Sequence, residues 1–136
     1  AAPGVWTWQL VNRLMKVIAV DNGPMDRRLM DSGQVEHVQA DGYMYKPKRT
    51  VDWMVCDIVD KPARSSALAA KWITQKLCRE LIINFKLPMK QRYPEVVQCL
   101  AHIQDALEAA GIRAEVACKQ LYTDREEVTC HIRVLR

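Results

Sequence analysis

Apolar residues recur along the chain in two alternating patterns, short continuous runs and longer stretches with helical spacing. Short runs rich in β-branched residues are typical of buried strands, whereas apolar residues three and four positions apart are typical of amphipathic helices. The runs predict strands over residues 16–20, 35–39, 51–59, 81–86, 113–122 and 128–135. The helical spacing predicts helices over residues 5–15, 25–30, 63–79 and 94–110.

This order of elements predicts an α/β fold with a mostly parallel sheet, because strands and helices alternate over most of the chain. The last two strands are separated by too few residues for a helical crossover, so we expect them to pair antiparallel at one end of the sheet. A chain of 136 residues is long enough for one domain with a real core.

Charged residues follow several of the predicted strands. Asp57 comes within the run 51–59 and Lys86 closes the next run. Ligands of α/β sheets gather outside the carboxyl ends of parallel strands, so we expect these two side chains to lie side by side over one crevice. An ion pair that merely neutralises two strand ends is the alternative. Asp21 and Asp41 also follow strands, where each is a candidate ligand or a turn residue.

Composition and charge limit the possible functions without choosing among them. A net charge of +4 permits a nucleic-acid partner, and no apolar run is long enough to cross a membrane. The five cysteines form no C-x-x-C pair, and the three histidines show no ligand spacing. We therefore expect a reducing cytoplasm, no disulfide framework and no metal site.

The glycine pattern indicates which kind of nucleotide cofactor the carboxylates Asp21, Asp41 and Asp57 would bind. Neither G-x-G-x-x-G nor G-x-x-x-x-G-K-[ST] occurs, so motifs that cradle a pyrophosphate or a triphosphate are absent. An Ala-Ala-Pro-Gly turn that enters a helix suits a cofactor without phosphate, such as S-adenosylmethionine. A carboxylate after the second strand can accept hydrogen bonds from both ribose hydroxyls of a nucleotide. Asp41 has the position to meet an adenine amino group, and Asp57 faces the reacting end.

Four motifs resemble the FtsJ-like ribose 2'-O-methyltransferases. They are Ala-Ala-Pro-Gly-x-Trp-Thr at 1–7, Val-Asp-Asn-Gly-Pro-Met at 20–25, Trp-Met-Val-Cys-Asp at 53–57 and Asn-Phe-Lys-Leu-Pro-Met-Lys at 84–90. The stretch 121–129, Leu-Tyr-Thr-Asp-Arg-Glu-Glu-Val-Thr, narrows the resemblance to the branch that methylates a cytidine ribose in 23S ribosomal RNA. The resemblance covers the whole chain and implies a Rossmann-like class I methyltransferase sheet, mostly parallel with one antiparallel C-terminal strand.

The resemblance also implies roles for single residues. Cofactor contacts would come from Ala2, Pro3, Gly4, Val5, Asp21, Asp41 and Asp57. In the family's Lys-Asp-Lys-Glu tetrad, Asp57 and Lys86 match the Asp and the second Lys, and Glu127 matches the Glu, with Glu126 as the near alternative. The family's first Lys, its first strand and an N-terminal RNA-binding domain would precede residue 1, so the domain over 1–136 is expected to be incomplete at its N-terminus.

The expected chemistry suits these residue types. A sulfonium methyl is already electrophilic, so the protein must position a ribose 2'-hydroxyl in line and remove its proton. A lysine removes a proton only when burial or a second cation lowers its pKa, and the strand end that carries Lys86 offers burial. We therefore expect Lys86 to act as the base, with Asp57 orienting Lys86 and Glu127 orienting either the ribose or the family's first lysine.

Basic loops are the candidate RNA contacts. Lys46, Lys48 and Arg49 lie in one loop and Lys90 and Arg92 in another, and we expect them to meet phosphates near the site unless they only solvate their loops. Two rival functions remain at this point. The chain is either a methyltransferase-like module that binds RNA without chemistry, or a methyltransferase of small molecules, although the latter would lack the strand-end lysine and the basic loops.

Overall fold

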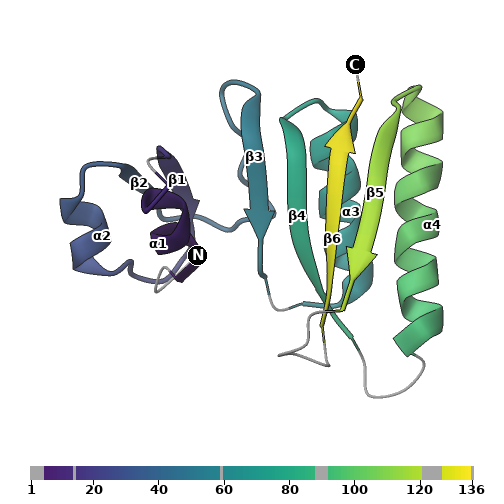
Figure 1. The fold of residues 1–136 in the computed structure, drawn as a ribbon, viewed down its shortest axis with the longest axis horizontal. Coiled ribbons are helices and arrows are strands. Elements are labelled where there is room, and N and C mark those ends of the chain that lie inside the picture. Colours follow the sequence, from purple (N-terminus) through teal and green to yellow (C-terminus); the bar gives the residue numbers. More distant parts are fainter. Residues whose placement is uncertain (1–4, 14, 59, 88–91, 121–126, 136) are drawn as a thin grey trace. The chain divides into compact units, whose positions relative to one another are not determined.

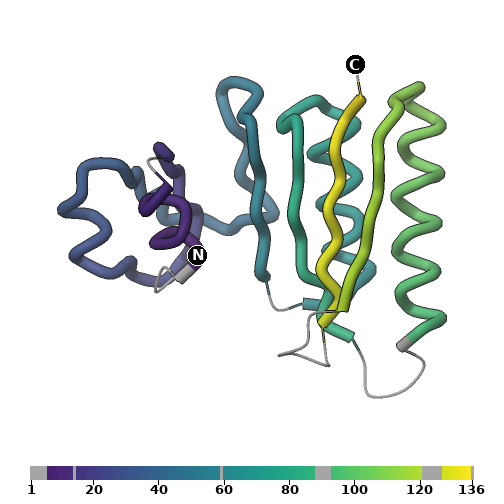
Figure 2. The backbone as a smooth tube through the Cα atoms, in the orientation of Figure 1, coloured from purple at the N-terminus to yellow at the C-terminus, as the bar shows by residue number. Residues whose placement is uncertain are grey.

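The computed structural model describes residues 5–13, 15–58, 60–87, 92–120 and 127–135. The chain divides into two compact units, residues 1–46 and 47–136. Each unit contains its own sheet, two-stranded in the first and four-stranded in the second. The ribbon and the backbone tube follow both units in chain order (Figures 1 and 2).

The first unit alternates helices with two parallel strands, as predicted. Its elements are α1 (Val5–Val11), β1 (Val17–Val20), α2 (Arg27–Asp31) and β2 (Val35–Val38). The two strands pair in register from Val17 opposite Val35 to Val20 opposite Val38. Ala19, Leu29 and Val35 form a small buried cluster between the sheet and α2. This cluster holds the two strands together, because β1, α2 and β2 each bury one apolar side chain in it and Val11 of α1 packs against it.

The second unit carries a mixed sheet with α3 behind it (Figure 1). Its elements are β3 (Val51–Cys56), α3 (Pro62–Thr74), β4 (Cys78–Lys86), α4 (Arg92–Ala110), β5 (Ala114–Lys119) and β6 (Glu127–Val134). The strand order is β3-β4-β6-β5, with β3 and β4 parallel and β6 antiparallel to both of its neighbours. The antiparallel C-terminal strand is thus confirmed, but it lies one position in from the edge rather than at the end of the sheet.

One face of this sheet is the core of the unit. Leu81, Ile83 and Phe85 of β4 are at most 1% exposed, and Cys130 and Ile132 of β6 are fully buried. The alternation along β4 and β6 places every second residue on the opposite face, away from α3. Those alternate residues include the polar and charged side chains that form the candidate site.

The boundary between α3 and β4 differs from the prediction. The helix was expected to reach residue 79, but it ends at Thr74, and Cys78 and Arg79 already belong to β4. Parallel pairing with β3 recruits these residues, since Val51 lies opposite Cys78 and its backbone N–H donates to the carbonyl of Leu77 at 2.9 Å. The hydrogen bonds of the sheet outweigh the helical pattern of the local sequence.

The prediction that the chain contains no disulfide is wrong. Cys118 and Cys130 lie directly opposite each other on β5 and β6, with Cα atoms 4.1 Å apart, and are joined by a disulfide. The antiparallel register, which the separate sequence segments do not reveal, brings the two thiols together. Cys56, Cys78 and Cys99 are buried free thiols, as expected of cysteines in apolar segments.

Candidate active site

Three charged side chains meet at the carboxyl end of β4. Lys86 Nζ lies 3.2 Å from Asp57 Oδ1 and also forms an ion pair with Glu127 Oε1. Asp57 follows the last residue of the parallel neighbour β3, and Glu127 is the first residue of the antiparallel neighbour β6. The predicted adjacency of Asp57 and Lys86 is therefore confirmed, while the catalytic roles of these residues stay predictions.

A buried amide links the two carboxylates behind Lys86. Asn84 Nδ2 donates to Asp57 Oδ1 and to Glu127 Oε2, both at 3.2 Å. Its Oδ1 accepts a hydrogen bond of 2.6 Å from the Thr129 hydroxyl. Asn84 is only 5% exposed. Asp57, Asn84, Glu127 and Lys86 thus form a closed ring of contacts.

The register of the sheet produces this ring. In the antiparallel pair, Lys86 lies opposite Glu127 and Asn84 lies opposite Thr129, so all four project from one face. Asp57 and Asn84 are 27 residues apart, the same offset that joins Trp53 to Glu80 in the parallel pair, so Asp57 continues this row past the end of β3. A slip of one residue would replace the polar set with Phe85 and Val128, which face the core.

The ring is partly exposed to solvent and carries a net negative charge. The side chains of Asp57, Lys86 and Glu127 are 42%, 25% and 15% exposed. Two carboxylates and one amine leave a net charge of −1, which favours a cationic group as a further occupant. Burial raises the pKa of the adjacent Cys56 thiol, so this cysteine stays protonated at neutral pH and is no thiolate nucleophile.

Asp21 and Asp41 lie in the first unit, each at a strand end or turn. Asp21 Oδ1 accepts from the backbone N–H of Gly23 at 2.8 Å, just after β1. Asp41 is exposed, and its Oδ1 accepts from the backbone N–H of Tyr43 at 2.9 Å. Both carboxylates therefore make the contacts expected of turn residues, which was the alternative to a ligand role. Such contacts are compatible with a ligand role, since a carboxylate has two oxygens.

Several predicted site residues fall outside what the structure describes. Ala2, Pro3, Gly4, Lys90 and Glu126 are not among the described residues, nor are the side chains of Val5 and Arg92. The cofactor turn, one of the two basic loops and the alternative glutamate therefore stay predictions from the sequence. Among the described residues, Glu127 is the glutamate that contacts Lys86.

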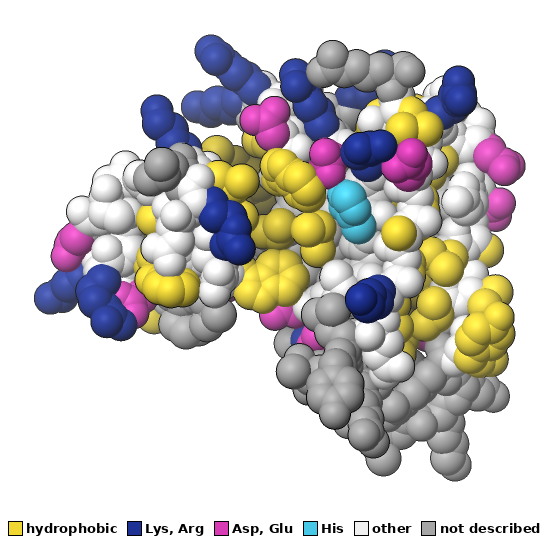
Figure 3. Space-filling model, viewed as in Figure 1, with side chains coloured by type: hydrophobic (Ala, Val, Ile, Leu, Met, Phe, Trp, Pro, Cys, Tyr) yellow, Lys and Arg dark blue, Asp and Glu magenta, His cyan; other side chains and the backbone are white. Residues whose placement is uncertain are grey.

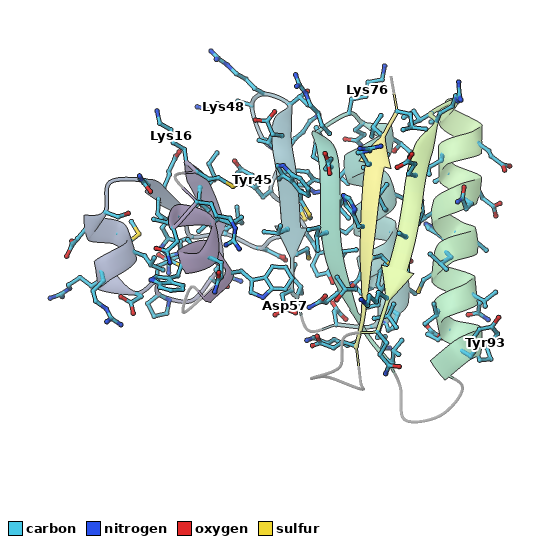
Figure 4. The ribbon with its side chains drawn as sticks, viewed as in Figure 1. Lys16, Tyr45, Lys48, Asp57, Lys76 and Tyr93 are labelled. Carbon is cyan, nitrogen blue, oxygen red and sulfur yellow. A yellow bond between two sulfur atoms is a disulfide. The ribbon has the colours of Figure 1, made fainter. Side chains whose placement is uncertain are left out.

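The other basic loop is not brought to the site. Lys48 and Arg49 are exposed and precede β3, whereas Asp57 follows it, so the six residues of the strand separate them. This corresponds to about 20 Å at the rise of a β-strand. Figure 4 shows Lys48 and Asp57 at opposite ends of β3. Phosphate contacts of Lys48 and Arg49 stay a prediction, at the end of β3 opposite to Asp57. Lys46 is exposed in the first unit.

The sequence reading missed Asn84 and Thr129. One signal was available, because Asn84 is a lone amide within the apolar run Leu81–Phe85, and a buried polar residue needs partners. The same sheet face continues away from the ring with Trp53, which stacks on His131 at a centroid distance of 5.7 Å. Figure 3 shows this face as a mixture of hydrophobic, basic and acidic side chains around a histidine.

Within the described ranges, no group of three or more His, Cys, Asp or Glu side chains has an arrangement suited to a metal ion. The helices of those ranges also include none with the length and apolar character needed to cross a membrane.

Known structures share the fold of the chain. Trm5b from Pyrococcus abyssi gives a TM-score of 0.59 at 11% identity, covering 98% of this chain and 50% of that one. A putative rRNA-methylase from Clostridium thermocellum gives 0.57 at 13% identity, covering 89% and 73%. Fibrillarin from Methanococcus jannaschii gives 0.54 at 14% identity, covering 86% and 55%. These similarities confirm the Rossmann-like fold of methyltransferases.

Similarity in sequence is much closer to a set of curated proteins, although no family model matches the chain. Ribosomal RNA large subunit methyltransferase M of Stutzerimonas stutzeri (strain A1501) is 64% identical over 135 residues, which cover 99% of this chain and 39% of that protein. The protein of the same name from Azotobacter vinelandii is 65% identical over 132 residues, covering 97% and 37%. The chain is therefore a homologue of the proteins named ribosomal RNA large subunit methyltransferase M, and it spans less than two fifths of their length.

Proposed function

We propose that the intact protein is an S-adenosylmethionine-dependent methyltransferase that modifies the 2'-hydroxyl of a cytidine in 23S ribosomal RNA. The observation that carries the proposal is the contact of Lys86 with both Asp57 and Glu127 at the carboxyl ends of β3 and β4. The name of the homologues supports ribosomal RNA as the substrate. The motif resemblance at 53–57 and 84–90 supports the ribose position, and the resemblance at 121–129 supports the cytidine in 23S ribosomal RNA.

In this reaction the neutral amine form of Lys86 accepts the proton of the ribose hydroxyl and returns to the ammonium form that pairs with Asp57 and Glu127. The hydroxyl oxygen forms a bond to the methyl carbon, the carbon–sulfur bond breaks, and its electron pair stays on the sulfur as a thioether. Asp57 and Glu127 orient the amine, and both lie within reach to share the proton that it receives. Positioning the hydroxyl in line with the methyl group supplies the rest of the rate enhancement.

The residues of the ring fit a sulfonium donor. S-adenosylmethionine, when bound, supplies an electrophilic methyl group on a positively charged sulfur. The net charge of −1 in the ring favours a cation beside it. Asp21, Asp41 and the turn at Ala2–Val5 would hold the adenosine and methionine parts, in agreement with the absence of a phosphate-binding glycine motif in the sequence.

RNA contacts would come from several regions of the intact protein. Lys90 and Arg92 follow Lys86 in the chain and are the candidates for phosphates beside the target ribose. Lys48 and Arg49 would contact RNA farther from it, and Lys46 of the first unit is a further candidate for phosphate contact. A separate RNA-binding domain would lie in the part of the homologues that this chain does not span, and an RNA substrate of this kind places the reaction in the cytoplasm.

Substitution of Lys86 tests the proposal most directly. In the intact protein, Lys86→Met removes the amine and keeps most of the packing, so methylation of unmodified ribosomal RNA should fall by about 10² to 10⁴-fold. Lys76→Met is the matched control, because Lys76 is an exposed lysine at the opposite end of β4 (Figure 4). We expect this control to keep the activity of the unsubstituted protein.

The same assay separates the alternatives. Near-normal methylation by Lys86→Met, together with complete loss in Asp57→Ala, would show that Lys86 is not the base. RNA binding without any methyl transfer by the unsubstituted intact protein would identify an RNA-binding module. Calorimetry should show that Lys86→Met binds S-adenosylmethionine at least as tightly as the unsubstituted protein, since Lys86 acts on the ribose and its loss makes the ring more negative.

A further inference from the structure

Asn84 is the buried member of the ring, and its amide N–H groups and carbonyl oxygen all have hydrogen-bond partners. Its two N–H groups are directed at Asp57 and Glu127, and its carbonyl oxygen accepts from Thr129. It makes no described contact with Lys86, so it does not compete for the amine. Through these contacts Asn84 links the carboxylates of Asp57 and Glu127 behind Lys86.

The orientation of this amide is fixed by charge. If the amide were reversed, its carbonyl oxygen would face two carboxylates, and the N–H group would face the Thr129 hydroxyl. Three acceptors would then lie together at a site where Asn84 is 5% exposed, with no donor among them. The Thr129 hydroxyl donates to Oδ1 at 2.6 Å and so holds the amide with its donors toward Asp57 and Glu127.

We propose that Asn84, oriented by Thr129, is a positioning residue that holds Asp57 and Glu127 at the spacing at which both contact Lys86. Two like charges that converge on one amine repel each other, and a neutral double donor between them offsets this repulsion without adding charge. Asn84 and Thr129 are paired across β4 and β6, so the sheet itself carries the alignment. The inference rests on the proposed function and extends it to the residues behind the base.

Two near-isosteric substitutions in the intact protein test the role. Asn84→Asp removes the donors and adds a third carboxylate, and Thr129→Val removes the hydroxyl that orients the amide. Misplacement of the carboxylates should lower kcat by about 10²-fold in Asn84→Asp and by about tenfold in Thr129→Val. In Thr129→Val, which leaves the charge of the ring unchanged, the KM values for S-adenosylmethionine and for RNA should stay within about twofold, because neither Asn84 nor Thr129 touches a substrate. Asn84→Asp adds a negative charge beside the sulfonium and is compared by kcat alone. Thr129→Ser restores the hydroxyl and should recover most of the lost kcat.

Glu80→Gln is the matched control. Glu80 lies on the same strand and face and contacts His131 of β6 at 2.8 Å, but it is outside the ring. We expect this variant to keep kcat. A positioning role is supported when kcat falls in Asn84→Asp and Thr129→Val but recovers in Thr129→Ser.

Other outcomes overturn the inference in recognisable ways. A kcat within twofold of normal in Thr129→Val and in a folded Asn84→Asp, alongside an inactive Lys86→Met, would leave the proposed function standing and remove Asn84 from it. A loss in Thr129→Val that Thr129→Ser does not recover, with a matching fall in melting temperature, would assign the pair a structural role only. Normal turnover in Lys86→Met would instead contradict the proposed function itself.

Discussion

At the scale of single residues, the candidate site depends on side chains that compensate one another at the rim of a buried sheet. Lys86 offsets the charges of Asp57 and Glu127, and the Asn84 amide fills the space between those carboxylates. Each member satisfies another, so removing one leaves a polar group without its partner. Effects of substitutions within the ring should therefore not be additive.

A residue-scale prediction concerns Cys78 at the start of β4. Burial raises the pKa of its thiol from about 9 to about 12. In the unfolded chain the thiol ionises near pH 9, while the folded protein keeps it neutral, so the unfolded state binds fewer protons between these values. Its contribution to the free energy of unfolding is present below pH 9 and is lost progressively as the pH rises toward 12.

Urea denaturation at a series of pH values from 8 to 10.5 checks this. The free energy of unfolding should fall more steeply with pH in the unsubstituted protein than in Cys78→Ala, whatever the difference between them at pH 8. Identical pH slopes would contradict the prediction.

At the scale of elements, α3 and α4 end in the same way with different residues. The N–H of Leu77 donates to Trp72 and that of Ile112 to Leu107, each spanning five residues, as in a Schellman motif. The residue directly before Leu77 and the one directly before Ile112 both have a positive φ, 56° for Lys76 and 67° for Gly111. Gly111 adopts this conformation without strain, and a glycine directly after a helical pattern is a stop signal in a sequence, whereas Lys76 carries no such signal.

This difference predicts opposite effects of two substitutions. Lys76→Gly should raise the free energy of unfolding by up to about 1 kcal/mol by relieving the left-handed conformation of a residue with a Cβ. Gly111→Ala should lower it by about 1 kcal/mol, and the strain comes from φ alone because the added Cβ has no atom within 4 Å. Thermal unfolding measures both. A Gly111→Ala variant more stable than the unsubstituted protein would contradict the shared motif. So would a Lys76→Gly variant whose loss of stability exceeds the cost of the greater conformational entropy of glycine in the unfolded chain.

At the scale of the whole molecule, the basic residues Lys48 and Arg49 are separated from the candidate site. The chain has a net charge of +4, yet the described ring is negative, and Lys48 and Arg49 lie about 20 Å from Asp57 along β3. Basic residues at that distance increase the affinity for a polyanion without touching the reacting ribose. Under the proposed function, Lys48 and Arg49 would therefore contribute to RNA binding and not to the chemistry.

The corresponding prediction uses Lys48→Ala and Arg49→Ala in the intact protein. Each should weaken RNA binding and reduce the slope of log Kd against log salt by about 1, because one phosphate contact is lost. The kcat and the affinity for S-adenosylmethionine should be unchanged. Filter binding across a salt series and single-turnover assays measure these quantities. A lower kcat with an unchanged salt slope would instead indicate a contact at the reacting group.

The order of strands and helices and the positions of Asp57 and Lys86 were predictable from the sequence, because hydrophobic periodicity acts over a few residues. A parallel pair also brings its carboxyl ends together by geometry alone, so the ion pair between these two residues could be anticipated. The motif resemblance added Glu127. The end of α3 was not predictable, since it depends on the pairing of Val51 with Cys78, 27 residues along the chain.

Only the tertiary structure decided where β6 inserts and which side chains it brings together. Its place between β4 and β5 sets Thr129 against Asn84, Glu127 against Lys86 and Cys130 against Cys118. The strand order depends on which arrangement buries the apolar faces of all four strands, and each segment by itself satisfies several arrangements equally well. The local pattern therefore determined which residues stand at strand ends, and the packing of distant strands determined which of them meet.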